Sequence, residues 1–238
     1  QFNSMIVVIK KIWLLIQAYV FPIYCVCCDV EGKWVCESCF NNIDIKGYFA
    51  CPICGVKNND GLSCCKSSIK KHISITKYDE KKIIEKIIYL LKYEHVDLIS
   101  LEITKIIKQF YNLDRSIFNE IDVIVPISLS KKRFKERGFN QAEVIANCLS
   151  NVIDIDVFNY LDRTKHTKQQ AKLTALERVL NVKGAFTCNT NINDQTVLLV
   201  DDVYTSGATM QAGSKALYKS GAKKVVGFSL ARAEMRNK

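Results

Sequence analysis

Residues 197–209 read VLLVDDVYTSGAT. The first four are apolar and predict a short buried strand. Two carboxylates, Asp201 and Asp202, follow at its carboxyl end, and a loop of small residues over 205–209 leads into a helix expected over 210–218. Ligands of open α/β sheets bind beyond the carboxyl ends of the strands. This stretch therefore predicts both a fold class and a binding site.

The chemistry of the stretch suits a sugar phosphate. A loop of small residues at a helix N-terminus offers backbone N–H groups, hydroxyls and a favourable dipole to a phosphate. The carboxylates of Asp201 and Asp202 would repel a second phosphate, but they accept hydrogen bonds from sugar hydroxyls. We expect the phosphate at 205–209 and a ribose at the two aspartates. The alternative is a strand that ends in a solvated turn, which does not need a run of five small residues.

Strands and helices alternate around this stretch. Further strands are expected over 121–127, ending near Pro126, and over 224–230. Amphipathic periodicity predicts helices over 79–96, 98–111 and 139–149. The alternation indicates an α/β fold, with a parallel sheet flanked by helices in a domain over 71–238.

Two basic segments precede the acidic stretch. Residues 128–141 follow the strand that ends at Ile127, so their loop should face the same ligand crevice. Residues 163–181 lack apolar periodicity at their start and indicate an exposed loop. Cations of these segments could neutralise a pyrophosphate leaving group, although an ordinary solvated charge run is the alternative. The candidate residues are Ser128, Arg137, Arg163, Lys165 and Lys168.

The chain has eleven cysteines, nine of them between Cys25 and Cys65. Pairs with Cys-x2-Cys spacing place two thiolates on one tetrahedral metal, and two such pairs complete a site. A segment of about fifty residues is too short for a large core, so bound metal would stabilise a small cysteine-rich module over 21–70. The preferred sites contain Cys25, Cys28, Cys36 and Cys39, and then Cys51, Cys54, Cys64 and Cys65.

Spacing alone leaves several alternatives to this arrangement. An interleaved pairing is equally allowed, and adjacent cysteines such as Cys64 and Cys65 chelate one metal badly, so the second site could be degenerate or empty. Disulfides, redox cysteines or an iron–sulfur cluster would also use such residues. The sequence shows no export signal, and structural disulfides are rare in the cytoplasm, where we expect this protein.

Charge and the first residues bear on partners. The formal net charge of +10 and pI near 9.0 point to anionic partners such as nucleic acid, a membrane surface or polyphosphate metabolites. The apolar run from Ile6 to Val20 is interrupted by Lys10 and Lys11 and is too short to span a membrane. We expect an amphipathic helix over 1–20 that packs on its own protein, with peripheral membrane contact through a basic face as the alternative.

Taken together, these motifs resemble the ComF family, and residues 201–209 resemble the phosphoribosyl-pyrophosphate (PRPP) motif of type I phosphoribosyltransferases. The resemblance covers about 20–235 and includes the Cys-x2-Cys pairs, Pro126, the string RGFNQ at 137–141 and the acidic stretch. It departs from the family at Ser128, where a second proline is frequent, and at the Cys64-Cys65 doublet.

The resemblance implies a zinc-ribbon-like module on a type I phosphoribosyltransferase-like domain. Asp201 and Asp202 would hold the ribose hydroxyls, with Mg²⁺ bridging to PRPP, and residues 205–209 the 5′-phosphate. The loop after Ile127 would be the pyrophosphate loop, and 163–181 a mobile hood. The implied PRPP-binding residues are Asp201, Asp202, Val203, Tyr204, Thr205, Ser206, Gly207, Ala208 and Thr209.

The resemblance also implies a role in natural transformation. Family members support the uptake and handling of single-stranded DNA, with a helicase-type partner at the inner face of the membrane. Two hypotheses follow: a PRPP-dependent transferase that displaces pyrophosphate, for example in nucleotide metabolism or salvage, or a binding module for single-stranded DNA with PRPP as a sensed ligand. The sequence identifies no catalytic residue and no acceptor pocket.

Overall fold

The computed structural model describes residues 22–78, 82–93, 96–164, 182 and 184–234 of the 238-residue chain. The chain forms two compact units, residues 1–43 and residues 44–238. The helix expected over 1–20 lies outside the described residues. The division into a cysteine-rich module over 21–70 and a domain over 71–238 stays a prediction.

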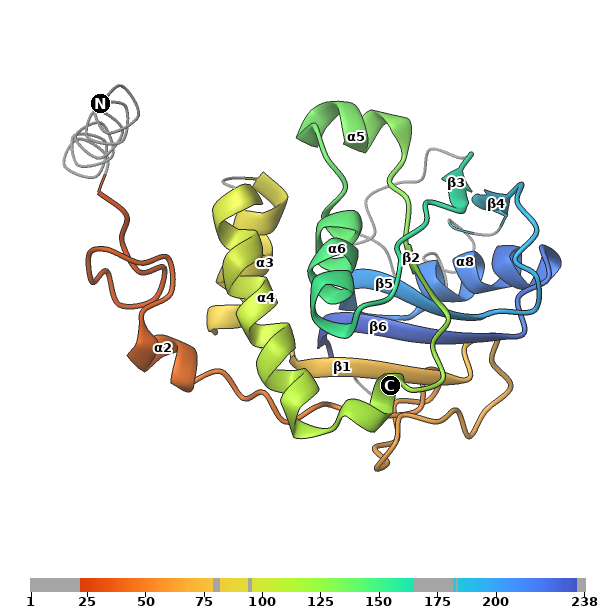
Figure 1. The fold of residues 1–238 in the computed structure, drawn as a ribbon, viewed down its shortest axis with the longest axis horizontal. Helices are drawn as coiled ribbons and strands as arrows, with labels where there is room; N and C mark the ends of the chain where they lie inside the picture. The colour runs from red at the N-terminus through yellow and green to blue at the C-terminus, as the bar shows by residue number, and fades with distance from the viewer. Residues whose placement is uncertain (1–21, 79–81, 94–95, 165–181, 183, 235–238) are drawn as a thin grey trace, which may run out of the picture. The chain divides into compact units, whose positions relative to one another are not determined.

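The second unit is built on a four-stranded parallel sheet in the order β1-β6-β5-β2 (Figure 1). Its strands are rich in β-branched residues and are buried almost throughout, as expected of parallel strands covered on both faces. They comprise β1 (Lys71–Lys77), β6 (Lys224–Arg232), β5 (Thr196–Tyr204) and β2 (Val123–Pro126). A separate antiparallel pair joins β3 (Leu161–Arg163) to β4 (Phe186–Cys188).

Helices cover both faces of the sheet (Figure 1). On one face α3 (Ile83–Tyr93), α4 (Val96–Leu113) and α6 (Gln141–Ile153) pack together. On the other face α8 (Ala208–Lys219) connects β5 to its neighbour β6. This arrangement follows from right-handed crossovers, because β5 to β6 and β1 to β2 run across the sheet in opposite directions. The described part of the first unit contains one short helix, α2 (Glu37–Asn41).

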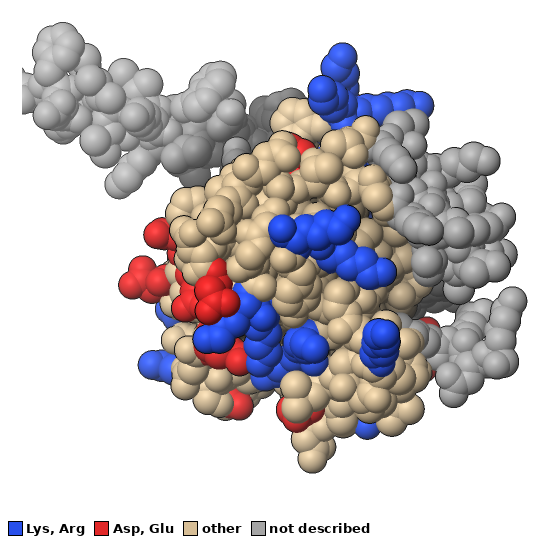
Figure 2. Space-filling model, turned by 90° about the vertical axis from the view of Figure 1, so that its right-hand side faces the viewer, with Lys and Arg blue, Asp and Glu red and all other residues tan. Residues whose placement is uncertain are grey.

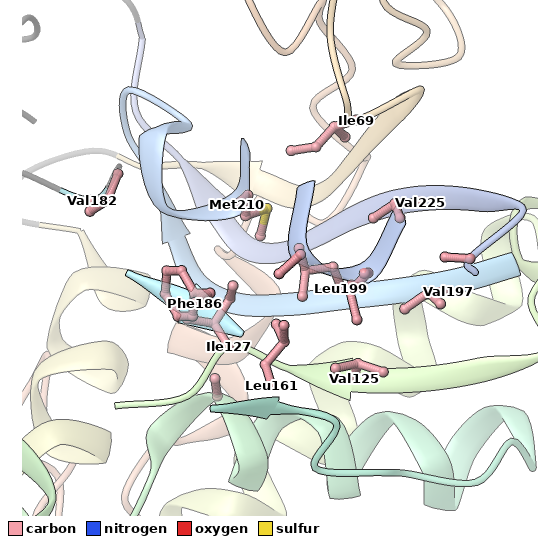
Figure 3. Packing of buried hydrophobic residues seen from close by; sticks show 14 of the residues in the cluster. Ile69, Val125, Ile127, Leu161, Val182, Phe186, Val197, Leu199, Met210 and Val225 are labelled. Carbon is pink, nitrogen blue, oxygen red and sulfur yellow. The ribbon is translucent and has the colours of Figure 1, made fainter. Parts of the chain in front are cut away.

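The alternation of β5 side chains builds a core on each face. Val197 and Leu199 belong to a buried cluster with Met210 of α8 (Figure 3), whereas Leu198 and Val200, also fully buried, point to the opposite face. Figure 3 also shows Ile127, Leu161, Phe186 and Val225 in this cluster. The cluster therefore joins the main sheet, the β3–β4 pair and α8, and it supports the segments that surround the candidate site.

The fold predicted from the sequence is confirmed, with corrections at three boundaries. First, β5 continues to Tyr204, so both aspartates lie inside the strand and not after it. The reason is the long ladder with β6, which pairs Asp201 with Ser229 and Tyr204 with Arg232. Second, α8 begins at Ala208, so the non-helical part of the small-residue loop is only 205–207.

The third correction concerns the basic segments. Residues 128–141 are not simply a loop, because α5 (Lys131–Arg137) forms within them. Ser130 caps this helix by accepting a hydrogen bond from the Arg133 N–H, and Gly138 ends it at φ 79°. Arg163 is not in an exposed loop either; it ends β3 and is 9% exposed. The sequence of α5 has no amphipathic pattern, so its capping residues, Ser130 and Gly138, are the only local signals for this helix.

Candidate functional site

A cavity of about 220 Å³ lies beyond the carboxyl ends of β2 and β5. Residues from α3, α5, α6, β3, β5 and α8 contribute to its walls, so the sheet edge and five surrounding segments meet there. The lining residues are Lys92, Ile127, Leu129, Arg133, Arg137, Gln141, Arg163, Asp201, Asp202, Val203, Tyr204, Thr205, Gly207, Ala208, Thr209 and Met210.

The two aspartates of β5, here called the acidic pair, differ in protonation. Lys92 Nζ lies 2.5 Å from Asp202 Oδ2. Burial raises the pKa of Asp202, but this ammonium and the Val203 N–H outweigh it and hold the pKa below its ordinary value. Burial, and then the charge of Asp202, raise the pKa of Asp201 to about 8. The acidic pair therefore carries about one proton at neutral pH.

Three arginines, Arg133, Arg137 and Arg163, line the cavity together with the acidic pair. Arg163 stacks on the Phe186 ring at 5.2 Å from its centroid. Burial and then the charge of Arg133 lower the pKa of Arg163 to about 10, while Asp201 opposes the shift, so the guanidinium stays charged at neutral pH. Arg137 donates a hydrogen bond of 2.9 Å to Gln141 Oε1. Because Arg133 and Arg163 are close enough to repel each other, an anion bound between their charges would relieve this repulsion.

The phosphate loop, residues 205–209, connects β5 to α8. Gly207 is the N-cap of α8 at φ 71°, and it has no side chain to satisfy the first helical N–H groups, so these can bind an anion. A Cβ atom at Gly207 would lie 2.0 Å from Tyr204 Oη, so glycine is required by space as well as by φ. Tyr204 Oη itself donates a hydrogen bond of 2.6 Å to the Pro52 carbonyl.

The cavity brings together most, but not all, of the residues expected from the sequence. Ser206 does not line it; its buried Oγ has no hydrogen-bond partner among the described residues and it borders a neighbouring cavity. Ser128 also lies outside, in a shallow pocket beside α5. Lys165 and Lys168 lie outside the described residues. All other members of the expected PRPP set, with Arg137 and Arg163, line the cavity.

Sequence reasoning missed three polar lining residues. Lys92 belongs to an amphipathic helix far from the acidic pair in sequence, and nothing in its surroundings distinguishes it from other helix lysines. Arg133 and Gln141 are both in the basic segment 128–141, and Gln141 ends the RGFNQ string, which was a usable signal. Asn140 of the same string is structural, because it caps α6 and donates to the Ile127 carbonyl.

The sequence profile of the phosphoribosyl transferase domain matches residues 92–233, more than half of the chain. The chain belongs to the phosphoribosyl transferase domain family. The match begins at Lys92 and ends just after β6, so it contains the whole cavity described above.

Curated relatives of this phosphoribosyl transferase domain carry competence names. The chain is 39% identical to competence protein F of Haemophilus influenzae over 116 residues, which are 47% of the chain and 51% of the relative. It is also 39% identical to competence protein ComFC of Bacillus subtilis over 112 residues, which are 47% of the chain and 45% of the relative. The chain thus matches about half the length of these two proteins. ComFC of Streptococcus pneumoniae is 28% identical over 215 residues, 85% of the chain and 89% of the relative.

Upstream of the matched segment, eight cysteines form two groups. The first cysteine centre contains Cys25, Cys28, Cys36 and Cys39, and the second cysteine centre contains Cys51, Cys54, Cys64 and Cys65; in each group the Sγ atoms lie within 4.8 Å of one another. The grouping is the sequential pairing preferred from the sequence and not the interleaved one. All eleven cysteines are free thiols, and the structure has no disulfide among the residues that it describes.

The geometry of both centres fits a tetrahedral metal. Zinc–sulfur bonds of about 2.3 Å place the sulfur atoms about 3.8 Å apart. The Sγ atoms of Cys28 and Cys36 are 3.5 Å apart, those of Cys54 and Cys64 are 3.4 Å apart, and those of the adjacent Cys64 and Cys65 are 4.0 Å apart. The adjacent pair is therefore not an obstacle in this structure. Both centres can hold a zinc ion.

The two buried cysteines are prepared to act as thiolates. Burial raises the pKa of Cys25, but backbone N–H groups, led by that of Cys36, outweigh it and lower the pKa to about 6. Burial raises the pKa of Cys51 in the same way, and the N–H groups of Cys54 and Ile53 lower it to about 5. Thiolates are the form that binds metal, so each centre has at least one ligand ready at neutral pH.

In the part of the chain that the structure describes, every helix is too short or too polar to cross a lipid bilayer.

Proposed function

We propose that the cavity binds PRPP with Mg²⁺ and that the protein acts in natural transformation, in the uptake and handling of single-stranded DNA. The observation that carries the first part is the meeting of the acidic pair, the phosphate loop and three arginines in one cavity. The names of the relatives, competence proteins F and ComFC, support the second part.

Each part of PRPP has a chemical complement in the cavity. The acidic pair accepts hydrogen bonds from the two ribose hydroxyls, and the N–H groups and hydroxyls of the phosphate loop bind the 5′-phosphate. Arg133, Arg137 and Arg163 neutralise the pyrophosphate. Mg²⁺, when bound with PRPP, would supply further positive charge against the phosphate groups. A transferase would use the same arginines to stabilise the charge that develops on departing pyrophosphate.

Calorimetric titration with PRPP and Mg²⁺ tests binding, and pyrophosphate release from the same sample tests turnover. We expect binding in the micromolar range, which a site with several charge-assisted hydrogen bonds supports. Binding without release, across a panel of nucleobases and single-stranded DNA, favours a binding module. Release that depends on an acceptor would instead establish a phosphoribosyltransferase of nucleotide metabolism. Absence of binding would overturn the proposal.

PRPP binding should release a proton near neutral pH. The pKa of Asp201 is raised to about 8, so the acidic pair without ligand carries one proton at pH 7. When ribose is bound, both carboxylates are ionised and accept hydrogen bonds. Binding then removes about one proton, and affinity rises with pH until about pH 8 and levels off above it. The number of protons released is measured by calorimetric titrations at pH 7 in two buffers of different ionisation enthalpy. PRPP is mixed with Mg²⁺ before each titration. Asp201→Asn should abolish most of the release; an unchanged release would contradict this assignment.

Helix α5 is the element that we propose for single-stranded DNA. It contains five cations in seven residues, and Phe134 is 48% exposed at its surface. Lysines bind phosphates and an exposed ring stacks on bases. Figure 2 shows that Lys and Arg side chains form several separate groups on one face of the molecule. One group lies at the top of the view, which is also the height of α5 in Figure 1, and acidic side chains gather toward the left.

Replacing the three α5 lysines should weaken single-stranded DNA binding and flatten its salt dependence. Each phosphate contact contributes about 0.7 to the slope of log K against log salt, so the triple change K131Q, K132Q and K135Q should reduce the slope by about 2. Fluorescence anisotropy over a salt series measures this. The matched control changes three exposed lysines in and after α8, K215Q, K219Q and K223Q. Equal losses in both triple variants would place the DNA elsewhere.

The remaining partners are also proposals. A helicase-type protein and the inner face of the membrane come from the resemblance alone, and residues 1–20, which would contact a membrane, lie outside the described residues. Zinc in the two cysteine centres is the metal that their four-thiolate geometry favours.

A further inference from the structure

Three consecutive carbonyl groups of the second cysteine centre are held by side chains of the central sheet. Arg232 Nη1 donates to the Ala50 carbonyl and Nη2 to the Cys51 carbonyl, both at 2.6 Å. Tyr204 Oη donates to the Pro52 carbonyl, also at 2.6 Å. Arg232 and Tyr204 are partners in the β5–β6 ladder, and each is 1% exposed. The metal-binding turn 51–54 therefore rests on two buried residues at the carboxyl ends of these strands.

The guanidinium of Arg232 is a buried charge that needs a counter-charge. Among the ion pairs of the described residues, no carboxylate contacts it; its neighbours are carbonyls, the Tyr204 ring at 4.7 Å and His72 Nδ1 at 3.4 Å. Burial and the charge of Arg232 hold the pKa of His72 well below its ordinary value, so His72 is neutral. Burial lowers the pKa of Arg232, and the hydroxyls of Tyr204 and Tyr48, followed by the sulfur atoms of Cys51 and Cys54, act against this effect.

The charge of a metal-loaded centre matches this arrangement. Four thiolates and one divalent cation leave two net negative charges, and residues outside the ligand set that compensate such charge raise metal affinity. Arg232 supplies one positive charge to the turn through its hydrogen bonds to the Ala50 and Cys51 carbonyls. A neutral side chain of the same size would leave both carbonyls without donors as well as removing the charge.

Tyr204 connects the same turn to the candidate ligand site. It directly precedes the phosphate loop, and its Oη lies where a Cβ of Gly207 would be, so the loop folds closely around the hydroxyl. Its ring contacts both the Arg232 guanidinium, at 4.7 Å from the ring centroid, and the His72 ring, whose centroid is 3.9 Å away. A change in the position of the Pro52 carbonyl would therefore move Tyr204 Oη against the backbone of the phosphate loop.

We propose that Arg232 is the counter-cation of the second cysteine centre, and that Tyr204 links this centre to the phosphate loop, so that metal and PRPP bind cooperatively. The Arg232 half needs only the metal, whereas the Tyr204 half rests on the proposed PRPP site. Both are positioning residues. Coupling between sites in proteins is commonly between about fivefold and 150-fold, and one buried hydrogen bond corresponds to about tenfold.

The Arg232 half is tested by zinc affinity in competition with a chromogenic chelator. Arg232→Met should weaken zinc binding at the second cysteine centre by at least about tenfold, and Arg232→Lys, which keeps the charge, should recover part of the loss. Alkylation of Cys51 and Cys54, located by peptide mass, assigns the loss to this centre. If Arg232→Met does not fold, Arg232→Lys decides: affinity close to the wild type supports the charge role. Wild-type affinity in Arg232→Met, or full loss in Arg232→Lys, overturns it.

The Tyr204 half is tested by the rate at which chelator exposes Cys51 and Cys54 to alkylation, with and without saturating PRPP and Mg²⁺. In the wild type PRPP should slow this rate about tenfold, and in Tyr204→Phe less than about twofold. Tyr218→Phe, which removes a hydroxyl that accepts from the Val225 N–H, is the control and should respond as the wild type does. PRPP that binds in calorimetry without changing the rate overturns the link. PRPP that does not bind overturns the proposed function and leaves the Arg232 result standing.

Discussion

Replacing both aspartates, Asp201→Asn with Asp202→Asn, should lower PRPP affinity by about 100-fold while leaving the zinc content unchanged. Hydrogen bonds to charged groups contribute about 1.5 kcal/mol or more each, and two of them are lost, which corresponds to about two decades in Kd. The cysteine centres are built by other residues, so their metal should not respond. Calorimetry measures the affinity, and elemental analysis of the same protein measures the zinc.

The matched control for this variant is Asp154→Asn with Asp194→Asn. Both residues are exposed and have positive φ, at 57° and 60°, a conformation that asparagine tolerates well. The control makes the same two Asp-to-Asn substitutions at a distance from the cavity and should bind PRPP normally. Because Lys92 loses its partner in the test variant, a thermal melt must show that it is folded. Unaltered PRPP affinity in the folded variant would show that the ribose is not held by the acidic pair.

Gly207→Ala should have the second large effect, on stability and ligand binding together. Backbone strain at φ 71° costs about 1–2 kcal/mol. The new Cβ would also meet Tyr204 Oη at 2.0 Å. Tyr204 is held by Arg232, His72 and the Pro52 carbonyl, so it cannot move without breaking its hydrogen bond, which costs about another 1 kcal/mol. We expect the free energy of unfolding to fall by about 3 kcal/mol and PRPP binding to be lost.

Gly138→Ala separates the two contributions to this effect. Gly138 has nearly the same φ, 79°, but no atom lies within 4 Å of a Cβ at that position. Its substitution should therefore cost only the backbone strain, about 1–2 kcal/mol. Urea denaturation of both variants measures the difference. Equal losses of stability would mean that the contact between Gly207 and Tyr204 contributes nothing, and this would also weaken the link inferred between the second cysteine centre and the phosphate loop.

The first basic segment shows how far local sequence signals reach. Residues 128–141 contain a good helix start at Ser130 and a good helix end at Gly138, yet they read as a loop because the seven residues between are mostly charged. Amphipathic periodicity is the main sequence signal for a helix, and so short a charged helix has none. Its position over the cavity depends on the strand that precedes it and on α6, which follows it.

The ends of β5 and the state of Asp201 show a different limit. Apolar residues predicted the buried part of β5, but the strand continues through polar residues because β6 offers backbone partners up to Arg232. The protonation of Asp201 depends on burial and on the neighbouring Asp202, whose own charge depends on Lys92. These effects depend on the distances between residues of different elements, and the sequence pattern of a single element does not predict such distances.

The sequence by itself determined the fold class and the position of the phosphate loop and acidic pair. Each of these is encoded in a short continuous motif, where spacing along the chain is also spacing in space. Only the tertiary structure placed Lys92 and Arg133 in the cavity with the acidic pair, selected the sequential grouping of the cysteines, and joined Arg232 and Tyr204 to the second cysteine centre. These residues come from separate strands and helices, and strand order and packing alone bring their charges and hydrogen bonds together.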